Sequence, residues 1–258
     1  ADRLIALDRD EDALNCNPHS ADGRLTLIRG NFRFVHNFTL EQGCVEGVDG
    51  ILADLGVSSH QFDTPERGFS FRFDAPLDMR MNNKASKSAL DVIADYAEAD
   101  LTRICRIYGD VDKPHKAAYL IARAREKSAI KTTYQLNEAL KPILPAFAEH
   151  KGLAKIYQAL RIEVNSEMRD LEKFLSSAAA ALKPGGRLAV ITYHSLEDRM
   201  VKNFIRCGNV DGEAEKDLYG NVKAPLEAIN RKPILPLEAE IASNTRARSA
   251  KLRLAIKA

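Results

Sequence analysis

Short apolar runs alternate with amphipathic stretches along the first sixty residues of the chain. Residues 4–8 form an apolar run that ends on an aspartate, residues 24–29 alternate like a strand, and residues 48–55 form a third run. The segments between these runs fit short helices. The order strand, helix, strand, helix, strand predicts a parallel α/β sheet.

The pattern becomes helical in the middle of the chain. Leu101, Ile104, Cys105 and Tyr108 share one helical face, which Gly109 ends, and a similar apolar face runs from Leu153 to Val164. We interpret these stripes as packing surfaces. The predicted organisation is therefore a core interrupted by an inserted helical domain: residues 1–82 (core, first part), 83–163 (inserted helical domain) and 164–258 (core, second part).

The last part of the chain returns to the α/β pattern. Residues 166–182 are amphipathic and end at a Pro-Gly-Gly sequence, after which residues 187–193 read as a buried strand. Ser195 and Asp198 have the spacing of a capping box for the next helix. A possible strand lies around residues 228–235, and the chain closes as another strand.

Composition narrows the class of protein. Hydrophobic residues make up 45% and charged residues 29% of the 258 residues, which is typical of a soluble globular protein. No apolar run approaches the ~20 residues of a membrane span, and the amino end lacks the pattern of a signal peptide, so we expect a cytoplasmic protein. The four cysteines are scattered and the histidines lack ligand spacing, so we expect free, mostly buried thiols and no metal site.

Two aspartates occupy the ends of predicted strands. In open α/β sheets, ligands bind at the carboxyl ends of the strands, where an acidic residue can hold a ribose. Asp8 has this position, although an aspartate there is equally often a helix N-cap, a role that suits Asp10. Asp54 ends the third run and is followed by a polar turn with Gly56, Ser58 and Ser59. Both aspartates are candidate site residues.

A loop of unusual composition follows the second aspartate. Residues 68–81 (GFSFRFDAPLDMRM) combine aromatic and arginine side chains with turn-forming residues. A surface loop is the plain alternative for such a segment. Taken together with the strand that ends at Asp54, the loop favours a binding site.

Three long motifs carry a resemblance to a known family. They are DLGVSSHQ with ERGFSFRFDAPLDMRM (54–61 and 66–81), YQALRIEVNSE (157–167), and YHSLEDRMVK with NTRARSAKLR (193–202 and 244–253). Together they closely resemble the bacterial small-subunit rRNA (cytosine-N4)-methyltransferases. The resemblance implies a Rossmann-like, class I S-adenosylmethionine-dependent methyltransferase fold with an inserted helical domain. It also implies methylation of a cytosine N4 amine in the decoding centre, and the 30S subunit as partner.

The resemblance also implies roles for individual residues. In that family a Gly-Gly-His turn, an acidic residue, a Phe, an Asp and a Gln hold the cofactor, and the last four match Asp8, Phe32, Asp54 and Gln61. The Gly-Gly-His turn has no counterpart, because the sequence begins after it; either a preceding segment is lacking or the site is incomplete. A hydrogen-bond acceptor must localise the lone pair of the cytosine amine, and Asp54 is the first candidate, ahead of Ser58 and Ser59.

Aromatic and basic residues are the candidates for RNA contacts. A base that leaves its stack is usually held by aromatic side chains, here Phe69, Phe71, Tyr193 and His194. For His194, at the predicted reaction centre, a hydrogen-bonded structural role is an equal alternative. Phosphate contacts set affinity and position. The basic candidates are Arg67, Arg72, Arg80, Arg199, Lys202, Arg246 and Arg248.

Two other functions compete with the methyltransferase. A non-catalytic RNA- or ribosome-binding protein with a degenerate or truncated methyltransferase fold would account for the missing turn. A nicotinamide-dependent oxidoreductase would rest on Asp8 alone and leave the aromatic and arginine-rich loop unexplained. A homodimer is an open alternative to a monomer.

Overall fold

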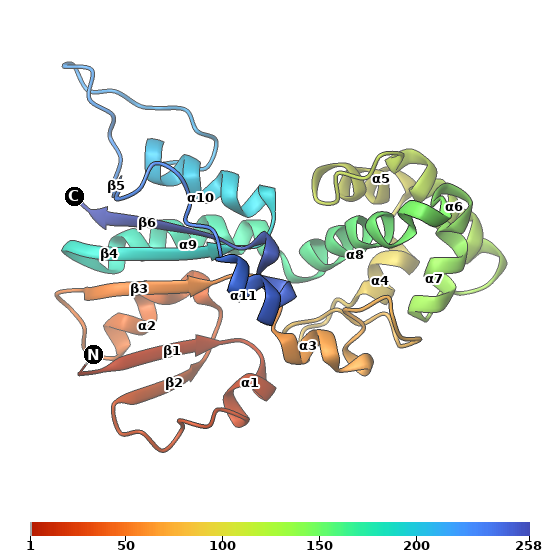
Figure 1. The fold of residues 1–258 in the computed structure, drawn as a ribbon, viewed down its shortest axis with the longest axis horizontal. Helices are drawn as coiled ribbons and strands as arrows, with labels where there is room; N and C mark the ends of the chain where they lie inside the picture. The colour runs from red at the N-terminus through yellow and green to blue at the C-terminus, as the bar shows by residue number, and fades with distance from the viewer. Residues whose placement is uncertain (1) are drawn as a thin grey trace. The chain divides into compact units, whose positions relative to one another are not determined.

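The computed structural model describes residues 2–258, which belong to two compact units (Figure 1). Unit 1 consists of Ala1–Gly56 and Met168–Ala258, and unit 2 is Val57–Glu167. Each unit has its own hydrophobic core. The second unit thus starts well before residue 83, where the sequence analysis placed the insert. The reason is that the loop after Asp54 is anchored in the unit 2 core by buried Leu77 and Met79.

Unit 1 combines strands with helices. Its core joins side chains of the strands to apolar side chains of three helices, α2, α9 and α10. The elements of unit 1 are β1 (Leu4–Asp8), α1 (Glu11–Asn15), β2 (Leu25–Arg29), α2 (Val35–Glu41), β3 (Val48–Asp54), α9 (Glu167–Ala181, whose first residue belongs to unit 2), β4 (Leu182–Thr192), α10 (Ser195–Cys207), β5 (Leu226–Ala228), α11 (Glu238–Ser243) and β6 (Lys251–Lys257).

The strands of unit 1 confirm the predicted α/β class. β1 and β2 are parallel, and so are β3 and β4, as the sequence pattern predicts. The remaining pairs differ, because β6 runs antiparallel to both β4 and β5. Within the described residues the hydrogen bonds form two separate sheets, β1-β2 and β3-β4-β6-β5. The arrowheads of β1 and β3 point in the same direction, so both strands end at the same side of the unit (Figure 1).

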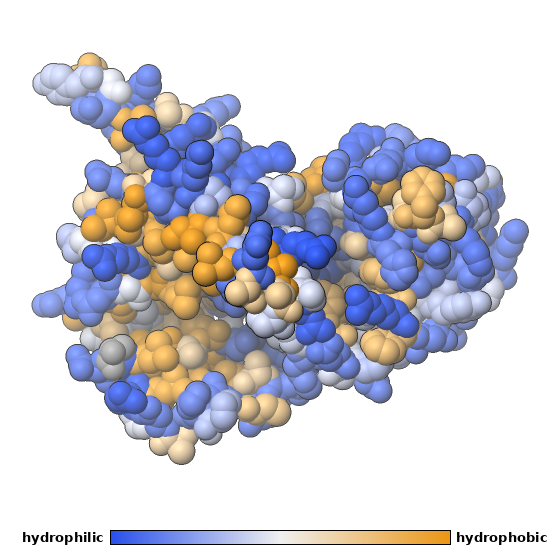
Figure 2. Space-filling model, in the orientation of Figure 1, coloured by the Kyte–Doolittle hydropathy of each residue, from blue (hydrophilic) through white to orange (hydrophobic). Residues whose placement is uncertain are grey.

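One face of these strands is rich in exposed apolar side chains. Leu52 in the middle of β3 is 70% exposed, and Leu4 at the start of β1 is 55% exposed. Figure 2 shows apolar residues gathered over the strands of unit 1 on the face that it presents. The helices therefore cover the strands incompletely in the part of the chain that the structure describes.

The joint between α9 and β4 differs from the prediction. The sequence pattern places the strand at residues 187–193, after the Pro-Gly-Gly sequence, whereas β4 already begins at Leu182. The partner of Val48 is Leu182 but the partner of Gly50 is Arg187, so the pairing shifts across this sequence. Gly185 has a φ of +77°, a conformation that glycine adopts without steric cost. The Pro-Gly-Gly segment is therefore an irregularity within the strand and does not precede it.

Unit 2 is helical. The apolar stripes that the sequence analysis assigned to packing are buried in its core, including Leu101, Ile104 and Cys105 on one helix and Ile156 and Leu160 on another. Its helices are α3 (Ser59–Asp63), α4 (Ala89–Asp95), α5 (Glu98–Ile107), α6 (Pro114–Lys127), α7 (Thr133–Leu140) and α8 (Glu149–Asn165). Of the four thiols, which are all free, Cys105 and Cys207 are buried as expected, while Cys16 is exposed.

Candidate functional site

Asp8 lies at the carboxyl end of β1, as predicted. Its Oδ1 accepts the backbone N–H of Asp10 at 2.8 Å, and Asp10 in turn caps α1 by accepting the N–H of Asp12 at 3.2 Å. The expectation that Asp10 is the helix cap is therefore confirmed. Although Asp8 is exposed overall, desolvation at the strand end and the nearby charge of Asp10 raise the pKa of its carboxyl above the ordinary value.

Phe32 lies three residues after the end of β2, the strand that pairs with β1. The N–H of Gly30 donates to the carbonyl of Asp8 at 2.9 Å, which brings the turn before Phe32 to the end of β1. The turn packs closely on the ring of Phe38, because a Cβ at Gly30 would come within 2.4 Å of that ring and would force it to shift. The ring of Phe32 is half-buried and packs on Phe174 of α9, with ring centroids 5.1 Å apart.

A buried carboxylate that the sequence analysis missed holds this turn. Asp170, in the first turn of α9, is only 2% exposed. It accepts hydrogen bonds from Asn31 Nδ2 at 2.6 Å and from Arg33 Nη1 at 2.9 Å, and Arg9 Nη1 lies 3.4 Å away. One feature of the sequence could have indicated Asp170. It lies four residues before Phe174, so this acidic residue is on the buried face of the helix.

Asp54 ends β3 and is bonded to a residue of the neighbouring strand. The hydroxyl of Tyr193 donates to Asp54 Oδ1 at 2.9 Å. Register explains the pairing, since Asp54 lies opposite Ile191 and Tyr193 comes two residues later. Burial, followed by the hydrogen bond and charge of Asp54, raises the pKa of Tyr193 to about 12. Asp54 itself remains exposed, so a carboxylate of fixed orientation faces solvent at this strand end.

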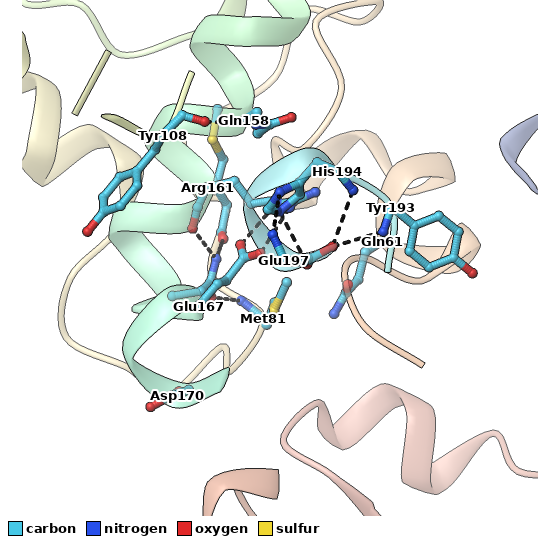
Figure 3. A network of polar contacts seen from close by, with 12 residues as sticks. Gln61, Met81, Tyr108, Gln158, Arg161, Glu167, Asp170, Tyr193, His194 and Glu197 are labelled. Carbon is cyan, nitrogen blue, oxygen red and sulfur yellow. Dashed lines mark hydrogen bonds and ion pairs between the residues drawn. The ribbon is translucent and has the colours of Figure 1, made fainter. Parts of the chain in front are cut away.

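His194 and Glu197 form the cap of α10. The N-cap is His194, and its Nδ1 accepts the N–H of Glu197 at 3.4 Å. Glu197 Oε2 accepts the N–H of Tyr193 at 2.9 Å, while the Tyr193 ring points away from this cap (Figure 3). The predicted capping box of Ser195 and Asp198 is thus wrong by one residue, because the helix starts at Ser195. These contacts agree with the alternative in which His194 is a hydrogen-bonded structural residue.

The candidates that follow β3 lie in unit 2 and serve as a helix cap. Ser58 Oγ accepts the N–H of Gln61 at 3.2 Å, and Gln61 Oε1 accepts the N–H of Ser58 at 3.1 Å. This reciprocal pair is the capping box of α3. Gln61 is only 4% exposed, whereas Ser58 and Ser59 are exposed. The capping contacts occupy the Ser58 hydroxyl and the Gln61 carbonyl oxygen.

Most candidates in the loop of residues 68–81 and just before it make contacts within unit 2. Phe69 is 4% exposed in the core, and the ring of Phe71 lies edge-on against Tyr157 at 5.4 Å. Arg67 donates to the carbonyl of Arg80, which itself holds Asp78 through two hydrogen bonds of 2.9 and 2.7 Å. Arg72 is the exposed one of the three arginines. The placement therefore favours packing for all of these residues except Arg72.

Other polar contacts anchor the ends of this loop and the start of α9. Asn165 Oδ1 accepts the N–H of Met81 at 2.8 Å, and Asn165 Nδ2 donates to the carbonyl of Met79 at 2.7 Å. Arg161 binds Glu167 through two hydrogen bonds, of 2.8 and 2.9 Å, also visible in Figure 3. The motif of residues 157–167 is thus partly explained by contacts that stabilise unit 2.

The basic residues of the carboxyl-terminal motifs divide into two groups. Arg199, Lys202, Arg246 and Arg248 are exposed. Arg253 instead is buried and donates to Asp198 at 2.7 Å, with Lys251 3.4 Å from the same carboxylate. Burial opposes the ionisation of Asp198, but the hydrogen bond and charge of Arg253 outweigh it and hold the pKa below its ordinary value. All four predicted RNA contacts of these carboxyl-terminal motifs are in the exposed group.

The site as a whole suits a nucleoside cofactor. The exposed carboxylates of Asp8 and Asp54 lie at the ends of β1 and β3. The half-buried ring of Phe32 lies just after β2, the neighbour of β1. A carboxylate is a suitable acceptor for ribose hydroxyls, and an aromatic ring packs well on a purine. An α/β sheet with this acidic edge and with an antiparallel strand beside its parallel ones has the fold of a class I methyltransferase.

Comparison with known proteins agrees with this class. The profile of the MraW methylase family matches residues 1–258, and the chain belongs to this family. The chain is 52% identical to the ribosomal RNA small subunit methyltransferase H of Bacteroides thetaiotaomicron, and the match covers 99% of this chain and 83% of that protein. Proteins with the same name from Flavobacterium johnsoniae and Parabacteroides distasonis are 54% and 49% identical, over 99% and 98% of this chain and 83% of theirs.

Two general conclusions follow from this membership. The protein is a methyltransferase, and its reaction requires a methyl donor. None of the helices within residues 2–258 has the length and apolar character needed to cross a membrane.

Proposed function

We propose that the protein transfers a methyl group from S-adenosylmethionine to the N4 amine of a cytosine in small-subunit ribosomal RNA. The observation that carries the proposal is the Tyr193–Asp54 pair at the ends of two adjacent parallel strands. The name of the similar proteins, ribosomal RNA small subunit methyltransferase H, supports ribosomal RNA as the substrate class. An enzyme with this substrate works where ribosomes are assembled, in the cytoplasm.

In the proposed complex, unit 1 supplies three cofactor contacts. Asp8 accepts hydrogen bonds from the two ribose hydroxyls, Phe32 packs against adenine, and Asp54 lies nearest the reacting methyl group. When bound, S-adenosylmethionine supplies an electrophilic methyl group on a positively charged sulfur. Gln61, which the family resemblance also implies, remains a prediction, since its carbonyl oxygen already caps α3.

The role proposed for Asp54 follows from the chemistry of the cytosine amine. The lone pair of that amine is delocalised into the ring, so the nitrogen is a poor nucleophile. A carboxylate that accepts the N–H bonds localises the lone pair on nitrogen. Tyr193 occupies Oδ1 of Asp54 and thereby fixes the orientation of the carboxylate. Rigid placement of the reactants then contributes most of the rate enhancement.

Binding of RNA is assigned to exposed basic residues. Contacts with phosphates provide affinity that does not depend on sequence and that falls with salt. Arg72 in unit 2 and the exposed residues of unit 1 are the candidates for such contacts, whereas Phe69 is buried in unit 2 and Arg80 is bonded to Asp78. The unit 1 residues are Arg199, Lys202, Arg246 and Arg248.

The test is methyl transfer to 30S subunits that lack this methylation. Full-length enzyme and labelled S-adenosylmethionine should label small-subunit rRNA, and mass spectrometry of the nucleosides should identify N4-methylcytidine. Asp54→Asn should lower kcat by tenfold or more, because a neutral amide accepts the amine N–H bonds less strongly than a carboxylate. Labelling at carbon 5 of cytosine, or of protein only, would contradict the proposal.

A binding experiment separates the cofactor site from the chemistry. Calorimetric titration of S-adenosylmethionine into the wild type and into Asp8→Ala should show at least a tenfold loss of affinity in the variant, or ~1.4 kcal/mol. Asp12→Ala is the matched control, because Asp12 is also acidic and lies only four residues later, in the first turn of α1. Equal affinities for all three proteins would remove Asp8 from the site. Absence of binding by the full-length wild type would favour a non-catalytic RNA-binding protein.

A further inference from the structure

Asp170 contacts residues on both sides of the proposed cofactor site. Its carboxylate is 2% exposed and accepts from Asn31 at 2.6 Å and from Arg33 at 2.9 Å, with Arg9 3.4 Å away. Ionised groups are rarely buried without partners, because desolvation costs several kcal/mol per ion. Three polar partners on two different loops offset that cost here.

The positions of these partners are informative. Arg9 directly follows Asp8, which accepts the ribose in the proposed site. Asn31 and Arg33 flank Phe32, and the Asn31 Oδ1 accepts the N–H of Arg33 at 3.1 Å, which caps the short 3₁₀ helix that begins at Phe32. Asp170 therefore connects the residue after the ribose acceptor to the residues on both sides of the adenine-packing ring.

Helix α9 holds the ring as well as its flanking residues. Phe174, one turn after Asp170, packs against Phe32 at 5.1 Å with an interplanar angle of 51°. Residues four apart on a helix lie on the same face, so the polar contact and the ring contact are neighbours. The two α9 side chains thus fix both the backbone and the side chain of the segment from Asn31 to Arg33.

We propose that Asp170 is a positioning residue of the cofactor site: its carboxylate sets the placement of Asp8 relative to Phe32 through Arg9, Asn31 and Arg33. The inference rests on the proposed binding of S-adenosylmethionine by Asp8 and Phe32. Without the carboxylate, two partly buried guanidinium groups lose their counter-charge and must turn toward solvent, with side-chain exposures now of 18% for Arg9 and 27% for Arg33. The two loops then lose their common anchor.

The experiment compares Asp170→Asn with Glu172→Gln in the full-length enzyme. Glu172 lies on the same helix but is exposed, so its variant controls for the loss of one negative charge. Calorimetry should show that Asp170→Asn weakens S-adenosylmethionine binding by tenfold or more, while Glu172→Gln is unchanged within twofold. In steady-state kinetics the KM for S-adenosylmethionine should rise in parallel, with kcat and the KM for 30S subunits kept within twofold.

A purely structural role gives a different result. If Asp170→Asn lowers the unfolding temperature but leaves the affinity for S-adenosylmethionine within twofold of the wild type, the proposal is overturned. If Asp170→Asn does not fold, Asn31→Ala replaces it, because this change keeps the charges while it removes the hydrogen bond to Asp170 together with the Asn31 cap of the 3₁₀ helix. Asn31→Ala should still weaken binding at least threefold, and an unchanged affinity would again overturn the proposal.

A measurement without cofactor tests the role of Asp170 separately from the proposed function of the protein. The side-chain amide of Asn31 should have a shifted NMR resonance in the wild type, because it donates a short hydrogen bond to a buried carboxylate. This resonance should shift toward the position of a free amide in Asp170→Asn, because a neutral amide oxygen accepts a weaker hydrogen bond than a carboxylate, and it should stay in place in Glu172→Gln. If the wild type shows it but binds no S-adenosylmethionine, the proposed function fails although the contact exists.

Discussion

The strand ends of unit 1 and the loop of residues 68–81 in unit 2 both stand out in the sequence, but their side chains have opposite surroundings. Asp8 and Asp54 are exposed and hold few contacts with the rest of unit 1. In the loop, Phe69 is buried and Arg80 is bound to Asp78. An unusual motif can therefore arise from a ligand site or from demanding packing, and only the contacts separate the two causes.

The largest expected effect concerns the aromatic core of the loop. Phe69→Ala should lower the free energy of unfolding by about 3–5 kcal/mol, because it leaves a cavity in the unit 2 core. Phe73→Ala is the control, since Phe73 belongs to the same loop and is 46% exposed. Urea denaturation of both variants checks the difference. A stable Phe69→Ala protein with reduced RNA affinity would show that the ring binds the substrate. It would contradict the conclusion that the loop side chains serve packing.

The next effect concerns the anchor of the loop. Asn165→Leu should cost about 2–4 kcal/mol, because the Met81 N–H and the Met79 carbonyl each lose a buried partner. Asn83→Leu, at an exposed position, should leave the urea midpoint almost unchanged. Similar midpoints for the two variants would show that these hydrogen bonds do not hold the loop.

A smaller effect is expected for the arginines of the loop. Arg80→Gln should destabilise the protein by about 1 kcal/mol, because the pair with Asp78 is partly exposed and water screens it. Arg72→Gln should not change stability but should reduce the salt dependence of RNA binding, if Arg72 contacts a phosphate. Urea denaturation and filter binding at several salt concentrations test the two arginines. If Arg72→Gln lowered stability and Arg80→Gln reduced the salt dependence, Arg72 would be the structural residue and Arg80 the RNA contact.

The smallest effect concerns the strand ends, and it appears only at high pH. The pKa of Tyr193 is raised to about 12, above the value of 10.0 for an unperturbed tyrosine. Since the unfolded chain loses this proton first, the stability that the phenol provides is present below pH 10 and is lost between about pH 10 and pH 12. Tyr193→Phe should remove this part of the pH dependence, whereas Tyr219→Phe, at a 90% exposed position, should not.

The measurement for this prediction is the phenolate absorbance during an alkaline titration of the native protein. Tyr96 and Tyr157 also titrate late, because burial raises the pKa of each, so the wild type should show three delayed tyrosines. Tyr193→Phe should leave two. If Tyr193→Phe instead removes a tyrosine that titrates near pH 10, the hydrogen bond to Asp54 is contradicted.

Much of unit 1 follows from local pattern. The strands that end at Asp8, Arg29 and Asp54 were predicted within one or two residues, since each apolar run is bounded by turn-forming or charged residues. The helix cap at Asp10 was also predictable, because a cap depends on neighbours in the chain. The MraW methylase membership was accessible for the same reason, through long motifs of contiguous residues.

Long-range contacts were not accessible in this way. Asp170 meets Asn31 across 139 positions of the chain, and Tyr193 meets Asp54 across another 139. The burial of Phe69 and the start of unit 2 at Val57 depend on which helices enclose the loop. Hydrophobic period and capping are set by residues a few positions apart, so the chain itself specifies the strands and caps. Which carboxylate stays open to a ligand, and which is used to hold two loops together, is decided by the packing of distant elements.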